Sequence, residues 1–165
     1  MTKEIIAIWA EDEDGVIGQN ATLPWHLPRE LQHFKKTTWQ QAILMGRVTF
    51  DGMNQRLLPN RQTLVLTRDL TYDYPGVIVV NSVEKALEWY HAQEKTLYII
   101  GGRKVLEAFA GYYDKLIRTR VHGHFSGDTY APTFDYSHYQ EQDALFYEKD
   151  EKNSHDFTVS VFVKK

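Results

Sequence analysis

Glu30 is the first residue whose surroundings suggest chemistry. It follows the stiff segment Leu23–Pro28, and Pro28 suits the first turn of a helix because its missing N–H has no helical partner there. Apolar residues flank this acid, and a carboxyl group in apolar surroundings keeps a raised pKa and can hydrogen-bond a flat polar ring. An acid in a first turn also complements the helix dipole, so Glu30 alone leaves a purely structural role open.

Two glycine-containing turns each lie between a strand-like and a helix-like segment. Gly46 forms one turn and Gly101-Gly102 forms the other. Glycine lets the backbone approach a ligand closely, and the free N–H groups at the start of a helix bind phosphate. Either turn alone is a weak signal, because glycine there often meets only a backbone requirement. Together the two turns suggest opposite ends of a pyrophosphate.

Four polar residues near these turns could bind anions. Thr67 and Arg68 follow a strand-like run, and Arg47 follows Gly46. In dinucleotide-binding folds an acid suits a free ribose 2′-OH, whereas arginine accommodates a 2′-phosphate, so these residues could select NADPH over NADH. Arg61 follows a proline turn, and its forked guanidinium could bind a carboxylate. Each arginine could also be an ordinary surface charge, and the chain has no G-x-G-x-x-G fingerprint.

The composition is that of a folded protein with a sizeable core. The chain has 165 residues, 42% of them hydrophobic and 25% charged, with a net charge of -3 and no cysteine. This length predicts a single domain over residues 1–165. The charge gives no reason to expect nucleic-acid binding, and the lack of cysteine excludes disulfides. The apolar run Ile5–Ala10 is too short for a membrane span or a signal peptide, so we expect a cytoplasmic protein with no membrane contact.

Metal-binding spacings are present but incomplete. Glu30 and His33 have the Glu-x-x-His spacing of di-iron bundles, which need four long helices and further glutamates. His122 and His124 would share one face of a strand, without an evident third ligand. We therefore expect no metal site.

Short apolar runs alternate with helix-like segments along most of the chain. The expected strands are Glu4–Ala10, Gln41–Met45, Gln62–Thr67, Val77–Val80, Thr96–Ile100 and Lys115–His122. The expected helices are Arg29–Thr38, Arg47–Met53, Val83–Gln93 and Arg103–Ala110, the third of them capped by Ser82. This alternation predicts an α/β fold with one central, mostly parallel sheet flanked by about four helices.

The C-terminal part has a different pattern. Two strand-like runs, Ala144–Lys149 and Asp156–Val163, flank the polar segment Asp150–Ser154. In the second run Phe157 and Val159 begin a two-residue alternation of apolar and polar side chains. We expect an antiparallel hairpin that closes one edge of the sheet and makes the sheet mixed.

Five segments, in order along nearly the whole chain, together resemble the dihydrofolate reductase family in its short bacterial form. They are Leu23–Leu31, Met45–Thr49, Leu57–Arg61, Gly101–Gly102 and Gly127–Thr129. Many bacterial members have Asp where this chain has Glu30. Val48, Arg103 and Leu106 also depart from the usual residues of the family.

The resemblance implies a pterin site around Glu30. Glu30 would bind the 2-amino group and the adjacent ring nitrogen, Thr119 would hydrogen-bond that carboxylate, and Trp25 would hold an ordered water. Arg61 would bind the α-carboxylate of the glutamate tail. The implied catalytic residues are Glu30, Trp25, Thr119 and Leu23. The implied substrate-binding residues are Ile8, Glu30, Leu31, Phe34, Met53, Leu58, Arg61, Ile100 and Thr119.

The resemblance also implies NADPH as the cofactor. Gly46, Gly101 and Gly102 would bracket the pyrophosphate, and Thr67 and Arg68 would face the adenosine phosphate. The implied cofactor-binding residues are Ala10, Ile17, Gly18, Gly46, Arg47, Val48, Thr49, Leu66, Thr67, Arg68, Ile100, Gly101, Gly102, Arg103, Lys104, Val105 and Leu106. Residues Gly18–Leu23 would form a mobile lid that Asp128 steadies from another loop.

The implied reaction reduces 7,8-dihydrofolate to 5,6,7,8-tetrahydrofolate for one-carbon metabolism, by hydride transfer from NADPH to C6 and protonation of N5 from solvent. We expect a monomer that binds dihydrofolate and antifolate inhibitors. Two alternatives stay open, a related pyrimidine reductase of riboflavin synthesis and an inert pterin or nucleotide binder. The Trp25–Glu30 segment and Arg61 argue against the first, and the retained acid and lid argue against the second.

Overall fold

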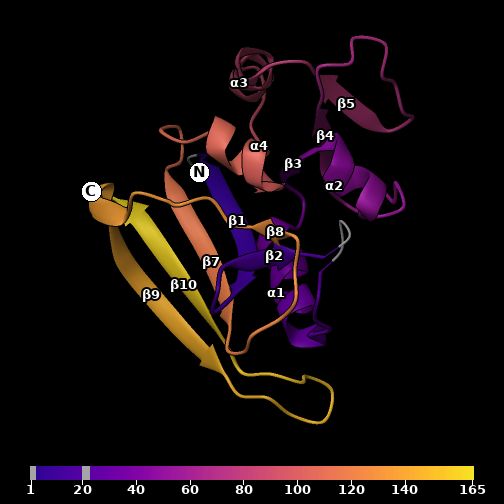
Figure 1. The fold of residues 1–165 in the computed structure, drawn as a ribbon. Coiled ribbons are helices and arrows are strands. Elements are labelled where there is room, and N and C mark those ends of the chain that lie inside the picture. Colours follow the sequence, from indigo (N-terminus) through magenta and orange to yellow (C-terminus); the bar gives the residue numbers. More distant parts are fainter. Residues whose placement is uncertain (1–2, 20–22) are drawn as a thin grey trace.

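One large mixed sheet organises the molecule. The computed structural model describes residues 3–19 and 23–165. The strands of this sheet are β1 (Ile5–Asp12), β3 (Ala42–Gly46), β4 (Gln62–Leu66), β5 (Val77–Val80), β6 (Leu97–Gly101), β7 (Lys115–Val121), β9 (Tyr139–Tyr147) and β10 (Phe157–Lys164). Their order is β5-β4-β3-β6-β1-β7-β10-β9 (Figure 1). All pairs from β5 to β7 are parallel, whereas β10 is antiparallel to both β7 and β9.

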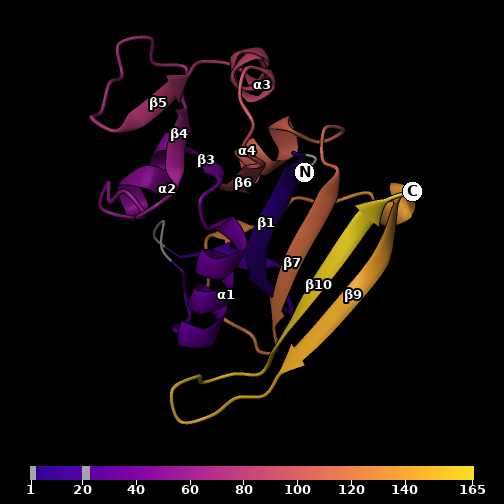
Figure 2. The ribbon, with the colours of Figure 1, turned by 180° about the vertical axis from the view of Figure 1, so that it is seen from behind.

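Four helices cover the two faces of this sheet. They are α1 (Pro28–Thr38), α2 (Arg47–Gly52), α3 (Val83–His91) and α4 (Arg103–Ala108). Because side chains alternate along a strand, Ile6, Ile8 and Ala10 of β1 share a cluster with residues of α1 and α2. The opposite side of β1 packs in a second cluster with α3 and α4. Figure 2 shows α1 in front of the sheet. Glu30 belongs to this helix, so it lies on the same face of the sheet as Ile6, Ile8 and Ala10.

The expected fold class is confirmed. Strand β5 has the expected limits, and the helices begin and end within two residues of the expected positions. Ser82 caps α3, since its Oγ accepts a hydrogen bond from the Lys85 N–H at 3.1 Å. The expected hairpin lies at the edge of the sheet, but β9 starts at Tyr139, five residues before the expected Ala144. The sequence from Tyr139 to Asp143 is mostly polar and exposed, so it lacks the apolar alternation that would mark a strand.

A small second sheet was not predicted. It pairs β2 (Val16–Gly18) with β8 (Thr129–Tyr130) in antiparallel orientation. Strands of three and two residues are too short to show a hydrophobic period. This sheet joins the segment after β1 to the segment after β7, beside the expected lid.

Candidate active site

Helix α1 turns its functional residues toward the sheet. Glu30, Phe34 and Thr38 are four residues apart and therefore lie on one face of the helix. Glu30 is only 7% exposed and Thr38 is fully buried, while Phe34 packs against the cluster that contains Ile8. Leu31 precedes Phe34 by three residues and Thr38 by seven, so it borders the same face, and it is 47% exposed. The spacing therefore buries an acid where a helix face would normally bury an apolar residue.

Strands β1 and β7 form the floor beneath this acid. They pair in parallel with Ile8 opposite Ile117 and Ala10 opposite Thr119. Because side chains alternate along a strand, these residues point to the same side of the sheet as the β1 residues that pack with α1. Thr119 is only 2% exposed. The structure thus brings Ile8, Ala10 and Thr119 to the face that α1 covers. No hydrogen bond joins Thr119 to Glu30, both of which the structure describes, so this bond stays a prediction.

The other expected substrate residues also belong to this face. Phe34, Met53, Leu58 and Ile100 all pack against the same cluster as Ile8 and Trp25. They come from α1, the end of α2, the loop that follows α2, and β6. Residues distant in sequence therefore share one apolar cluster on the face of the sheet that α1 covers.

Two buried polar groups in this region lack partners. Within residues 3–19 and 23–165, no group donates a hydrogen bond to the Glu30 carboxylate or pairs with it, and burial raises its pKa to about 7. The Trp25 Nε1–H is buried and also has no partner among these residues. Buried polar groups in proteins are almost always satisfied, by protein, water or ligand. Both groups are therefore free to bind a polar ligand or water.

The Glu30 carboxyl makes the stability of the ligand-free protein depend on pH. Its pKa in the folded state, about 7, exceeds the ordinary value of 4.5, so its stabilising contribution is complete at low pH. This contribution is lost as pH rises from the ordinary value through the folded-state pKa. Glu30→Gln removes the ionisation. We therefore expect the free energy of unfolding of this variant, relative to that of the wild type, to increase by up to about 3 kcal/mol from pH 5 to pH 8. Urea unfolding of both proteins at the two pH values measures this difference, and an equal difference at both would contradict it.

The first turn of α1 is held by a residue that the sequence did not suggest. Leu27 occupies the cap position and makes no side-chain bond there. Instead, Oδ1 of Asn153 accepts a hydrogen bond from the Arg29 N–H at 2.9 Å. Asp150 accepts a bond from Asn153 Nδ2 at 2.9 Å and forms a 2.7 Å ion pair with Arg29. The loop between β9 and β10 therefore caps the helix next to Glu30.

We expect Asn153→Ala to destabilise the fold by about 1–2 kcal/mol, because it removes a helix cap and leaves the Arg29 N–H without its partner. The control is Ser154→Ala in the same loop, whose exposed hydroxyl is hydrogen-bonded to the half-buried His155. It should change stability by less than about 0.5 kcal/mol. Urea unfolding at neutral pH compares the two variants, and equal stabilities would remove Asn153 from this role.

Arg61 is fixed at the other end of α1. Its Nε donates to the Pro59 carbonyl at 3.0 Å and its Nη1 donates to Thr38 Oγ1 at 3.3 Å. In the part of the chain that the structure describes, no carboxylate pairs with Arg61. The guanidinium is oriented and keeps unused donors, as recognition of a ligand carboxylate requires.

The two glycine turns lie next to each other at the ends of β3 and β6. These strands are paired, with Met45 opposite Gly101. Gly101 has a φ of 144°, a conformation that residues with a Cβ rarely adopt, and its peptide bond to Gly102 is cis. A Cβ on Gly46 would lie 3.0 Å from Val105 Cγ2 and 4.0 Å from the Gly101 carbonyl oxygen. Thr49 Oγ1 would lie 3.5 Å from a Cβ on Gly102. The two turns are therefore closely packed, and pyrophosphate binding there stays a prediction.

The expected residues of the adenosine end also gather in one region. Arg47 begins α2, whereas Leu66, Thr67 and Arg68 lie at the end of β4 and just beyond it. Arg68 is exposed, and Val48 is among the most exposed large apolar residues. Arg103 and Lys104 are also exposed, and Arg103 is paired with Glu107 at 2.8 Å. One acid that was not predicted, Asp69, lies 3.1 Å from Arg47.

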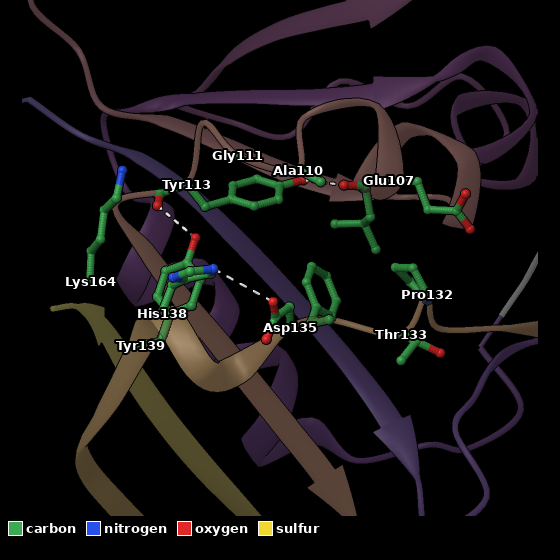
Figure 3. Close-up of a pocket in the computed structure, with 12 residues that line it drawn as sticks. Glu107, Ala110, Gly111, Tyr113, Pro132, Thr133, Asp135, His138, Tyr139 and Lys164 are labelled. Carbon is green, nitrogen blue, oxygen red and sulfur yellow. Dashed lines mark hydrogen bonds and ion pairs between the residues drawn. The ribbon is translucent and has the colours of Figure 1, made fainter.

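Leu106 lies deeper than expected for a cofactor contact. Its side chain has no exposed surface, and its carbonyl accepts a hydrogen bond from Tyr113 Oη at 2.8 Å. It borders a cavity of about 400 Å³ between α4 and residues 132–139, where Phe134 also lies (Figure 3). Of the expected site residues, only Leu106 lines this cavity, so we assign no substrate to it. Contact between Leu106 and the cofactor stays a prediction.

The expected lid is described only at its ends. Residues 20–22 lie outside the described residues. Gly18 ends β2, and its carbonyl accepts a hydrogen bond from the Asp128 N–H at 3.0 Å. Leu23 is 45% exposed at the other end. Asp128 is therefore placed beside the start of this segment, as expected, and Ile17 packs against the α3 and α4 cluster.

Comparison with known proteins decides the family. The family profile described as dihydrofolate reductase matches residues 4–164. The dihydrofolate reductase of Lactococcus lactis is 50% identical over 163 residues, which is 97% of each chain. This chain belongs to the dihydrofolate reductase family. The dihydrofolate reductase of Bacillus subtilis is 37% identical over 158 residues, 96% of this chain and 93% of its own.

A solved structure supports the same assignment. It is the dihydrofolate reductase from Enterococcus faecalis, complexed with NADP(H) and RAB-propyl. It is 40% identical, has a TM-score of 0.95 and covers 98% of this chain and 96% of its own. The family, the enzyme class and NADPH as the cofactor of a dihydrofolate reductase are confirmed, and the pyrimidine reductase is not favoured. In the described part of the chain, no helix is long and apolar enough to cross a membrane.

Proposed function

We propose that this chain reduces 7,8-dihydrofolate to tetrahydrofolate with NADPH, and that Glu30 is the residue that holds the pterin. The observation that carries the proposal is the buried, unpartnered carboxyl of Glu30 on the sheet-facing side of α1. Its two oxygens can accept hydrogen bonds from the 2-amino group and the adjacent ring nitrogen of a pterin. Thr119 lies on the face of β7 that α1 covers, and it orients the carboxylate.

The pKa of Glu30 suits control of one proton. A carboxyl group whose pKa is near 7 holds or releases a proton at neutral pH without large cost. Its negative charge close to the pterin favours a protonated ring and raises the basicity of N5. The proton reaches N5 through water, and the unpartnered Trp25 Nε1–H holds a water molecule near the same ring. NADPH supplies the hydride to C6.

The remaining residues bind the two ends of each ligand. Arg61 binds the α-carboxylate of the glutamate tail, while Phe34, Met53 and Leu58 contact the aminobenzoyl ring. Backbone around Gly46, Gly101 and Gly102 holds the pyrophosphate, and the residues of the adenosine end, Arg47, Thr67 and Arg68, face the 2′-phosphate. The support for these roles is that the structure gathers each group of residues in one place.

The protein acts as a cytoplasmic monomer with residues 1–165 as one domain. A diaminopyrimidine offers Glu30 the same paired donors as a pterin does, so antifolates compete with dihydrofolate at this site. Size-exclusion chromatography with light scattering tests the monomer directly.

The proposed function is tested by the loss of NADPH absorbance in the presence of dihydrofolate. NADH serves as the alternative cofactor, and methotrexate serves as the inhibitor. We expect rapid oxidation of NADPH that depends on dihydrofolate and stops with methotrexate, and slower oxidation of NADH. NADPH binding without turnover would instead favour an inert binder.

A further inference from the structure

A negative charge lies where the proposed site places a phosphate. Asp69 follows Thr67 and Arg68 in the turn after β4, and its Oδ2 lies 3.1 Å from Nη1 of Arg47. The Arg47 guanidinium also lies 4.5 Å from the centre of the Tyr72 ring, and its Nε is 4.0 Å from Asp51. Arg47 is therefore already engaged by an acid before any phosphate binds.

The turn itself holds Asp69 in this position. Its Oδ1 accepts hydrogen bonds from the Thr71 N–H at 2.9 Å and from Thr71 Oγ1 at 2.7 Å. Its own N–H donates to Thr67 Oγ1 at 3.2 Å. The bonds from Thr71 lower the pKa of Asp69, and the charge of Arg47 adds to this effect. The carboxylate is therefore ionised at neutral pH, with one oxygen directed to the turn and the other to Arg47.

The two residues have opposite preferences for the adenosine ribose. In dinucleotide-binding sites a carboxylate accepts a hydrogen bond from a free 2′-hydroxyl, whereas arginine accommodates a 2′-phosphate. A phosphate monoester carries nearly two negative charges at neutral pH. A carboxylate in contact with the same arginine repels that phosphate and competes for the guanidinium donors.

We propose that Asp69 is a specificity-determining residue that limits the preference of this chain for NADPH over NADH. The inference rests on the proposed placement of the adenosine phosphate at Arg47. Asp69 weakens binding of the phosphorylated ribose and accepts a hydrogen bond from the unphosphorylated one. The chain therefore places a residue that attracts the 2′-phosphate, Arg47, beside one that repels it, Asp69.

The test measures equilibrium binding of 2′,5′-ADP, 5′-AMP, NADPH and NADH by calorimetry. Asp69→Asn keeps an oxygen for the Thr71 bonds and removes the charge. We expect this variant to bind 2′,5′-ADP and NADPH more tightly by on the order of tenfold, with no gain for 5′-AMP or NADH. Asp69→Ser also keeps an acceptor for Thr71. It should raise the preference for 2′,5′-ADP over 5′-AMP in the same direction, which would exclude an effect specific to asparagine.

Two further variants distinguish an error about Asp69 from an error about the position of the phosphate. Asp73→Asn removes the same charge from the same exposed segment without a contact to Arg47, and should leave all four affinities within about twofold. Arg47→Gln should abolish most of the preference for 2′,5′-ADP over 5′-AMP. If Arg47→Gln abolishes it but neither Asp69 variant changes it, the inference about Asp69 is wrong and the proposed phosphate site stands. If Arg47→Gln has no effect on it, the proposed placement of the phosphate at Arg47 is wrong, and the inference about Asp69 is wrong with it.

Discussion

Glu30→Gln lowers kcat for dihydrofolate at pH 7.5 by roughly 100- to 1,000-fold, the order of effect expected for loss of a group that controls a proton and stabilises charge. Glutamine has nearly the same shape and still accepts one hydrogen bond from the pterin. It carries no charge to favour a protonated ring and cannot release a proton. Because burial raises the pKa of Glu30 to about 7, the wild-type group can do both at neutral pH.

Two comparisons identify the cause of this loss. Glu84→Gln replaces another glutamate in the first turn of a helix, but one that is exposed on α3. It should leave kcat within about twofold of the wild type. NADPH affinity of Glu30→Gln, measured by fluorescence titration, should change little. If Glu30→Gln had the kcat of the wild type, Glu30 would have no catalytic role and only its interaction with the helix dipole would remain.

Arg61→Ala raises KM for dihydrofolate by roughly 10- to 100-fold, the range for loss of a charge-assisted hydrogen-bonded pair. The reason is geometric, since Thr38 and the Pro59 carbonyl already orient the guanidinium and no carboxylate of the described residues occupies it. A pterin substrate without the glutamate tail should show little change in KM. Steady-state kinetics with both substrates measures the difference.

A nearby arginine provides the control for this variant. Arg56 is exposed in the segment that follows α2. Arg56→Ala should leave KM for both substrates within about twofold of the wild type. Equal losses for the tailed and tailless substrates in Arg61→Ala would mean that Arg61 supports the fold or the pterin rather than the tail.

The fold was predictable because its signals are local. Apolar runs and helix periods identified the strands of the central sheet, and the spacing of Glu30 and Phe34 placed the acid beside the apolar residues of its own helix. The order of strands brought Ile8, Thr119 and α1 together, and this arrangement agrees with the roles that the resemblance implied. Pattern therefore predicted the regular elements, whereas the roles of Ile8 and Thr119 came from the resemblance.

Contacts between loops could not be predicted in the same way. Asn153 caps a helix that begins more than a hundred residues earlier, and no local pattern links the two. Asp69 likewise meets Arg47 only because β4 pairs with β3 and brings the turn beside α2. The depth of Leu106 depends on how α4 packs against Tyr113. Each of these features follows from tertiary packing rather than from propensity or period.

The most direct test of the account is the pH dependence of kcat/KM for dihydrofolate in the wild type and in Glu30→Gln. In the wild type kcat/KM should be level below about pH 7 and fall up to tenfold per pH unit above it, because this parameter reports the pKa of the free enzyme. In Glu30→Gln it should rise continuously as pH falls through this range, because no carboxyl at this position then binds the proton. A wild-type profile without a change of slope near neutral pH, or the same inflection in both proteins, would contradict the role assigned to Glu30.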